Sequence, residues 1–143
     1  MRPGGLVILT TPNVLSVNSR IRYLFFGFAT LFGPIPASRP ESFSTVGHIT
    51  PVSYFYLAQA LAETGFVDVT LDIDKVQRSG SVKLVFLWPL IWLFGSLAKR
   101  RERARYHTID LTNEAFVDQI NSTRMLLGRT IVVSARKPAD PDA

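Results

Sequence analysis

The order of apolar and polar positions along the chain predicts three strands and several helices. Near the N-terminus, residues 6–10 read LVILT and follow a Pro-Gly-Gly turn. Strands that are apolar at successive positions are usually buried on both faces, inside a parallel sheet that helices cover. The pattern therefore predicts an interior strand at 6–10, followed by a turn at Thr11, Pro12 and Asn13.

Two later segments also have the character of strands. Residues 67–74 alternate strictly between apolar and polar side chains, which predicts a strand with one polar face near a sheet edge. Residues 130–134 form a short apolar run, which predicts a second interior strand. The last residues, 137–143, are expected to form a disordered tail.

The helical signals are clearest in the segment that follows Thr50. Thr50 is expected to cap a helix that has Pro51 at its first position and Gly65 as its stop. A short surface helix is predicted at 112–120. Earlier in the chain, residues 20–36 are apolar and aromatic before a Pro/Gly cluster, which indicates a short helix or a lid.

A long apolar segment comes directly before a basic cluster. Residues 84–98 contain no charged side chain and include Pro89 and Gly95, which are expected to interrupt a helix. Even a continuous helix of this length would reach only about 22 Å, short of the roughly 30 Å hydrocarbon core of a bilayer. We therefore expect an interfacial or re-entrant membrane segment, with Trp88 and Trp92 at the level of the lipid headgroups. The alternative is a buried lid or dimer contact, since apolar runs of this length are often core helices.

Composition indicates one globular domain. The chain has 143 residues, of which 47% are hydrophobic and 19% charged, so we expect a single domain over 1–143 in which 82–105 is an apolar and basic insertion. The chain has no cysteine and two histidines, which excludes a disulfide framework and argues against a structural metal site. No secretory signal is recognised, so a cytoplasmic protein is expected, peripheral to the inner face of the membrane if the apolar segment binds there.

The net charge of +5 is concentrated in one place. Residues 99–105 hold five cations and one acid, and the rest of the chain is nearly neutral. A single basic cluster beside an apolar run suits an anionic membrane surface better than a nucleic-acid groove, where cations are spread over a face. Lys99, Arg100, Arg101 and Arg103 are therefore the expected membrane contacts. The alternative is the solvated, charged end of a helix.

Three motifs in this order resemble the C-terminal half of a class I S-adenosylmethionine-dependent methyltransferase, similar to the type 11 and type 12 groups. They are RPGGLVILTTPN, GHITPVSYFYLAQALAETGF and GRTIVVSARKP. The resemblance covers most of the chain outside 82–105. It implies strands like the fifth, sixth and seventh of that family, with the seventh antiparallel and inserted between the other two. The expected fold is therefore α/β, a partial Rossmann-like methyltransferase sheet with an apolar helical insertion.

The half of the family that holds the cofactor is not recognised in these motifs. The family binds S-adenosylmethionine through a glycine-rich loop after its first strand and an acidic residue at the end of its second. Gly4 and Gly5 precede a strand instead of following one, so they do not carry over as that loop. We therefore assign no cofactor-binding residue. A truncated gene model, a late start codon and a split protein would each explain a missing N-terminal half.

The resemblance implies methyl transfer from S-adenosylmethionine to a small acceptor that is hydrophobic or membrane-associated. His48 lies in the loop before the acceptor-side helix, where similar enzymes often have a histidine facing the substrate, so it is the candidate catalytic residue. The alternative is a capping or loop-packing histidine. Thr11 and Asn13, at the carboxyl end of the first strand, are with His48 the candidate substrate-binding residues. The competing hypothesis is a non-catalytic module that binds a membrane or a partner.

Overall fold

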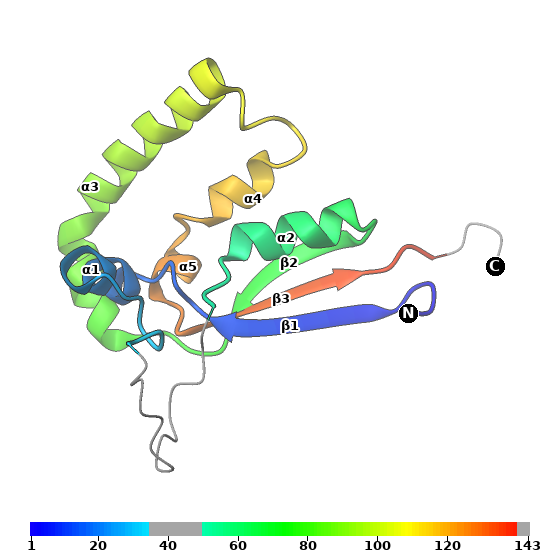
Figure 1. Cartoon of the computed structure of the whole chain (residues 1–143), viewed down its shortest axis with the longest axis horizontal. Helices are drawn as coiled ribbons and strands as arrows, with labels where there is room; N and C mark the ends of the chain where they lie inside the picture. The colour runs from blue at the N-terminus through cyan, green and yellow to red at the C-terminus, as the bar shows by residue number, and fades with distance from the viewer. Residues whose placement is uncertain (35–49, 140–143) are drawn as a thin grey trace, which may run out of the picture.

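The computed structural model describes residues 1–34 and 50–139 and contains a three-stranded sheet with helices packed on one face (Figure 1). The strands β1 (Leu6–Pro12) and β2 (Val67–Ile73) lie on either side of β3 (Thr130–Arg136). Because β3 runs antiparallel to both, β1 and β2 point in the same direction. The fold is therefore mixed α/β with an antiparallel sheet.

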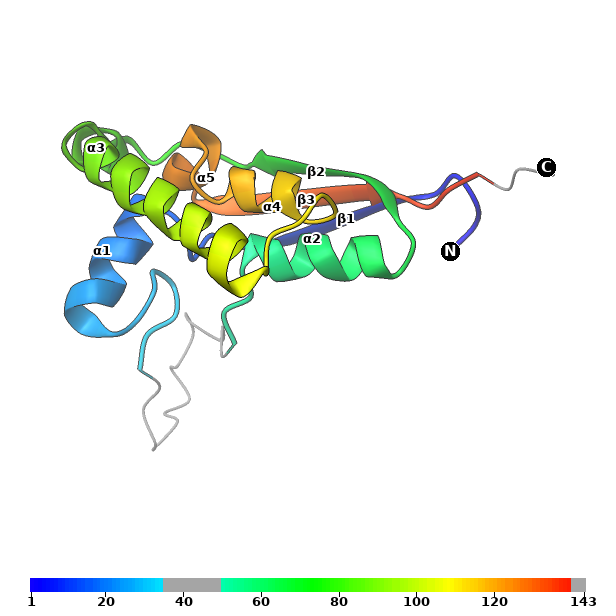
Figure 2. The same cartoon turned by 90° about the horizontal axis from the view of Figure 1, so that it is seen from above.

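Five α-helices and one π-helical turn accompany these strands in the described part of the chain. They are α1 (Val17–Phe26), α2 (Tyr54–Glu63), α3 (Arg78–Arg101), the π-helical turn η1 (Glu102–Tyr106), α4 (Glu114–Gln119) and α5 (Thr123–Leu127). α2 lies along one face of the sheet, whereas α1, α3 and α5 lie beyond the carboxyl ends of β1 and β2 (Figures 1 and 2).

The larger core cluster joins α2, the sheet and α5. Its buried members are Tyr54, Ala58, Leu61, Leu71, Met125, Ile131, Val133 and Ala135. On β3 the buried residues alternate with half-buried ones, because successive side chains of a strand face opposite sides. One side of the sheet and the apolar face of α2 therefore form the core.

A smaller core cluster attaches α3 to this core. Its buried members are Val17 of α1, Leu84 of α3 and Leu126 of α5, packed among Ile21, Leu87, Ile91 and Leu127. Met125 and Leu126 are neighbours in α5, yet Met125 belongs to the larger cluster and Leu126 to the smaller. This five-residue helix therefore links the sheet to α3.

The structure confirms the predicted positions of two strands and corrects the third. β3 is interior and β2 is at an edge, as expected. β1 is also at an edge, and its Leu6 and Ile8 side chains are 50% and 57% exposed, so the predicted burial of this strand on both faces is wrong for the described chain. The last strand lies between the other two, as expected. The neighbouring strands of the described sheet are all antiparallel, whereas a Rossmann-like sheet is mostly parallel.

The start of α2 differs from the prediction. The helix begins at Tyr54 with Ser53 as its N-cap, not at Pro51 after Thr50. Serine is as good an N-capping residue type as threonine, so the sequence offers two starting points and the later one is used. Gly65 follows the helix with a φ of 82°, a conformation that favours glycine and confirms it as the stop.

Two helices begin at serine caps that the apolar pattern does not reveal. The Ser16 side chain accepts a backbone amide of the first turn of α1, which ends at Phe26, well before the expected Pro/Gly cluster. The Ser122 side chain does the same for α5, a helix that the sequence analysis does not predict. The predicted surface helix at 112–120 is confirmed as α4, with Asn113 at its N-cap.

The apolar segment forms one continuous helix. α3 passes through Pro89 and Gly95 without a break, so the expected interruption is wrong. Residues 137–139 of the expected tail are described, and the Lys137 amide donates to the Gly5 carbonyl at 2.9 Å. Residues 140–143 of that tail lie outside the described residues.

The first prediction concerns the exposed edge of β1. An edge strand with apolar side chains on an uncovered face favours edge-to-edge pairing between copies. Ile8→Lys places a charge on that face and should shift the chain toward monomer in sedimentation velocity in mild detergent. Tyr56→Lys, at a side chain of α2 that is 69% exposed, is the matched control and should leave the distribution unchanged. Equal association by the wild-type chain and Ile8→Lys would contradict a role of this edge.

Candidate functional site

α3 carries apolar side chains on both faces, but protein covers only one of them. Toward α1 and α5, Leu84 is buried and Leu87 and Ile91 are half-buried. The opposite face, here called the outer face of α3, exposes Val82, Val85, Phe86, Leu90, Leu93, Phe94 and Leu97. An exposed apolar face of this extent marks a surface for a protein or a membrane.

By length and composition, the helix that runs through residues 78–106 could cross a membrane. It has 29 residues, a mean hydropathy of 1.7 in its most apolar window, and only 6% of that window buried. An apolar core helix of a soluble domain would be buried all round. The exposure of α3 is therefore unlike that of a buried lid, and the other alternative, a dimer contact, stays a prediction.

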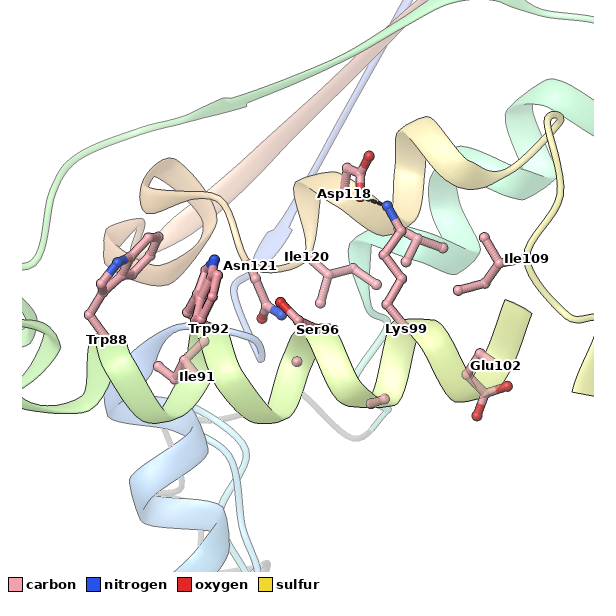
Figure 3. A pocket seen from close by; sticks show the side chains of 13 residues that line it. Trp88, Ile91, Trp92, Ser96, Lys99, Glu102, Ile109, Asp118, Ile120 and Asn121 are labelled. Atoms are coloured by element: carbon pink, nitrogen blue, oxygen red, sulfur yellow. Dashed lines mark hydrogen bonds and ion pairs between the residues drawn. The ribbon is translucent and has the colours of Figure 1, made fainter. Parts of the chain in front are cut away.

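A groove with a volume of about 340 Å³ lies between α3 and α4 (Figure 3). We call it the α3–α4 groove. Trp88 and Trp92 line one end of it, and Lys99 with Asp118 lines the other. Ser96 and Asn121 lie next to each other between these ends (Figure 3). The groove is therefore apolar at one end and ionic at the other.

The ionic end of the groove is a network of charged side chains. Lys99 Nζ lies 3.1 Å from Glu114 Oε1 and also pairs with Asp118, while Arg103 pairs with Glu114. The bond to Asp118 raises the pKa of Lys99. The bonds from Lys99 and then from Arg103 lower the pKa of Glu114. These shifts have the direction expected of groups that attract each other in their charged forms.

This network divides the basic cluster into two parts. Lys99 and Arg103 bind carboxylates of α4, so they hold α3 to α4. Arg101 donates to the Tyr106 hydroxyl at 3.1 Å. Arg100 is exposed and has no ion pair among the described residues. It lies seven residues after Leu93 of the outer face, so it lies on the same face of α3. Of the four cations among the expected membrane contacts, Arg100 and Arg101 are therefore the ones not engaged by carboxylates of α4.

Asn13 is a buried residue at the carboxyl end of β1. It is 3% exposed, and its Nδ2 donates to the carbonyls of Met125 at 2.6 Å and Gly128 at 2.9 Å. Its Oδ1 accepts the Leu15 amide at 2.9 Å. The backbone therefore engages both ends of this amide, which gives Asn13 a structural role. Its contact with a substrate stays a prediction.

One predicted site residue, Thr11, lies apart from the groove. Thr11 is half-buried on the core-facing side of β1, where it is paired with Ile131. His48 lies outside the described residues. Within 1–34 and 50–139, no three histidine, aspartate or glutamate side chains gather closely enough to hold a metal ion.

The sequence patterns do not predict that α4 forms one wall of the groove. Glu114 and Asp118 are four residues apart, which places them on one face of the predicted surface helix. That spacing is visible in the sequence, but the partner of the face is not, because the turn at 107–113 that folds α4 back along α3 has no apolar pattern.

Comparison of the chain with models of protein families, with curated proteins and with solved structures found no match.

The second prediction concerns acid pH. Because the folded-state pKa of Glu114 is lowered below its ordinary value of 4.5, its ion pairs contribute stability above that value and lose it as the pH falls through the folded pKa. Trp88 and Trp92 are the only tryptophans of the chain, so their fluorescence should change in a step below pH 4.5. Glu114→Gln should remove the step. Glu63→Gln, at an exposed carboxylate of α2, should keep it, and a step that survives in Glu114→Gln would contradict the assignment.

Proposed function

We propose that this chain is the acceptor-side half of a class I S-adenosylmethionine-dependent methyltransferase that works at a membrane surface. The observation that carries the proposal is the strand order, in which β3 lies antiparallel between β1 and β2. The three motifs imply this order for the fifth, seventh and sixth strands of that family. The strand order agrees with this expectation, whereas the apolar patterns alone predict only that β2 lies at an edge and β3 in the interior.

The uncovered parts of the sheet support the same proposal. β1 has a free edge in the described chain, and Leu6 and Ile8 are exposed on the side away from the core. A cofactor-binding half would add a strand beside β1 and cover these side chains. In open α/β sheets, ligands bind at the carboxyl ends of the strands. In this chain, the carboxyl ends of β1 and β2 point toward α1 and α3 (Figure 1).

The described residues do not fit S-adenosylmethionine. Gly4 and Gly5 form a turn at the amino end of β1, where the Gly4 amide donates to the Lys137 carbonyl at 3.0 Å. This turn is at the opposite end of the strand from the expected crevice. Under the proposal, the cofactor is held by a polypeptide segment outside this sequence.

The contribution of this chain to methyl transfer is to position the acceptor. The reaction requires donor and acceptor in line, and a base where the acceptor loses a proton. His48 is the proposed base, Thr11 lies at the carboxyl end of β1, and α3 would hold the site against the bilayer from which a hydrophobic acceptor comes.

The packing of α3 favours an orientation in the plane of the membrane interface. Its inner face contacts α1 and α5, and α1 carries Asn18 and Arg20 near that contact. A helix spanning the bilayer would take these polar groups to the depth of the hydrocarbon, which is costly. An interfacial helix instead buries its outer face in the headgroup region while Arg100 and Arg101 meet anionic lipid.

The second candidate function is a non-catalytic membrane-binding module. The outer face of α3 supports it equally, and so does the poor fit of the described residues to the cofactor. The two proposals share the membrane contact and differ in whether a partner half brings S-adenosylmethionine to the sheet.

The third prediction separates these two functions. Calorimetric titration of the purified chain with S-adenosylmethionine should show no binding in the micromolar range. Co-expression with the coding sequence upstream of Met1 should produce a complex that binds the cofactor if the methyltransferase proposal is right. No binding by that complex would favour the non-catalytic module, and micromolar binding by the chain alone would contradict the assignment of the cofactor site to another half.

The fourth prediction tests the membrane contact. The chain should float with vesicles of phosphatidylcholine and phosphatidylglycerol. Arg100→Glu with Arg101→Glu should weaken partition by roughly 30-fold or more, since each cation near an anionic surface contributes about 1 kcal/mol. Arg129→Glu with Arg136→Glu makes the same change of charge at exposed residues outside α3 and is the control. Equal flotation by the two double variants would contradict the proposed contact.

A further inference from the structure

The end of α1 carries a cluster of apolar side chains that the described residues leave largely uncovered. The last turn of the helix and the turn after it expose Tyr23, Leu24, Phe25, Phe26 and Phe28, here called the α1 tip. Single exposed apolar residues are ordinary on soluble proteins, whereas a contiguous apolar patch marks an interaction surface. The α1 tip is separate from the contact with α3, because Val17 and Ile21, earlier in α1, make that contact.

The α1 tip is held in a fixed shape by hydrogen bonds. Gly27 follows the helix with a φ of 73°, and its amide donates to the Tyr23 carbonyl at 2.8 Å. The chain then turns back, so that the Thr30 amide donates to the Ser19 hydroxyl at 3.2 Å, and this hydroxyl donates to the Asn13 carbonyl at 3.0 Å. The exposed rings therefore belong to a preorganised protrusion, which loses little conformational entropy when it binds a partner.

The exposed side chains of the α1 tip surround the helix axis. Successive residues of an α-helix are about 100° apart, so the consecutive residues 23–26 point to all sides. A helix that docks in a protein groove presents anchors on one face, three or four residues apart. A second copy of this chain would also cover one side. A fluid bilayer, in contrast, closes around an inserted protrusion and can cover residues 23–26 together.

The charges beside the α1 tip favour an anionic bilayer. Residues 14–34 hold two arginines, Arg20 and Arg22, and no aspartate or glutamate. The Arg22 guanidinium lies over the Phe26 ring, 5.3 Å from its centroid, and has no ion pair among the described residues. Arg22 precedes Phe26 by one turn, about 6 Å along a helix axis. A cation at this distance can reach lipid phosphates while the rings enter the acyl chains.

The α1 tip and the start of α3 lie at the same end of the molecule. In both views, α1 and the first turns of α3 are at the left, whereas the N-terminus and the end of β3 are at the right (Figures 1 and 2). The carboxyl ends of β1 and β2 point toward the same end (Figure 1). A bilayer at this end can therefore contact the α1 tip together with Val82, Val85 and Phe86, the exposed apolar residues of the first turns of α3.

We propose that the α1 tip inserts into an anionic bilayer, as a second membrane contact beside the outer face of α3. The last carbonyls of a helix have no intrahelical donor, so the insertion is shallow and ends where water still reaches them. Two contacts fix the orientation of the chain, with the carboxyl ends of β1 and β2 facing the lipid. The inference rests on the proposed function for its membrane and deepens it, because a hydrophobic acceptor would then enter the site directly from the bilayer.

The lack of cysteine in the chain allows a direct test. Leu24→Cys is labelled with the fluorophore NBD and mixed with vesicles of phosphatidylcholine and phosphatidylglycerol. Its emission should shift to the blue, and lipids with a doxyl group on the acyl chain should quench it. Leu111→Cys, at a leucine that is 95% exposed in the turn before α4, is the matched control and should show neither change. The same signal at both positions would overturn the proposal.

Removal of the inserted groups should weaken the binding to these vesicles. Leu24→Ser with Phe25→Ser should reduce partition by roughly tenfold or more, because apolar side chains are no longer transferred from water. Arg22→Glu should reduce it by roughly fivefold or more. Tyr56→Ser with Leu111→Ser removes exposed apolar side chains elsewhere and should leave partition unchanged. Wild-type partition by the Leu24 and Phe25 double variant or by Arg22→Glu, with helical circular dichroism preserved, would overturn the proposal.

A last arm separates this inference from the membrane contact of α3. The label at Leu24→Cys is also placed in the chain with Arg100→Glu and Arg101→Glu, where a blue shift at lower vesicle affinity would support two contacts. An unchanged affinity with the blue shift would keep the α1 tip and reject the contact of α3. Flotation of the labelled chain without a blue shift would keep the membrane proposal and overturn the insertion of the α1 tip. A blue shift without vesicles that grows with protein concentration would identify a second copy as the occupant and also overturn it.

Discussion

The hydrogen bonds between Asn13 and α5 are the interaction on which the rest of the arrangement depends. α5 has five residues, too few to be stable as an isolated helix, yet Met125 belongs to the core of the sheet and Leu126 to the cluster that holds α3. The Asn13 amide binds the carbonyls of Met125 and Gly128 from the end of β1. The sheet therefore fixes α5, and α5 fixes α3. Each buried carbonyl left unpaired would cost about 1–3 kcal/mol, a large part of the stability of a small domain.

A second set of bonds sets the position of α4. The Arg20 guanidinium donates to the Ile120 carbonyl and to Asn121 Oδ1, both at 2.9 Å, while its Nε donates to the Leu15 carbonyl at 2.8 Å. Burial lowers the pKa of Arg20, and these three neutral acceptors replace the water that the cation loses. With the ion pairs between Lys99 and α4 at the far end, they hold α4 along α3 at two points. Polar contacts therefore fix the groove between the helices at its ionic end and at Asn121, between its two ends.

The sequence predicts the strands and the surface helix well, because period two and local capping residues determine them. It predicts poorly what covers each element. The apolar strand at 6–10 indicates side chains that avoid water, but not which neighbour covers them, and Leu6 and Ile8 are exposed in the described chain. Asn13 follows a turn signal, and nothing local distinguishes an amide that faces a ligand from one that binds a helix far along the chain. The two tryptophans and the basic cluster are visible in the sequence because they are local features, and their membrane contact stays a prediction, whereas α5 and the acidic face of α4 depend on tertiary contacts.

Pro89 limits how far α3 can enter a bilayer. Proline has no backbone N–H, so the carbonyl of Val85, one turn earlier, lacks its helical donor. Val85 is 72% exposed on the outer face, and Pro89 is exposed as well. The Val85 carbonyl is therefore exposed to the solvent or lipid around that face. In pure hydrocarbon it would stay unsatisfied at a cost of several kcal/mol, whereas in the headgroup region a water molecule can donate to it. The depth of α3 in the membrane is then limited by how deep a water molecule can reach the Val85 carbonyl oxygen.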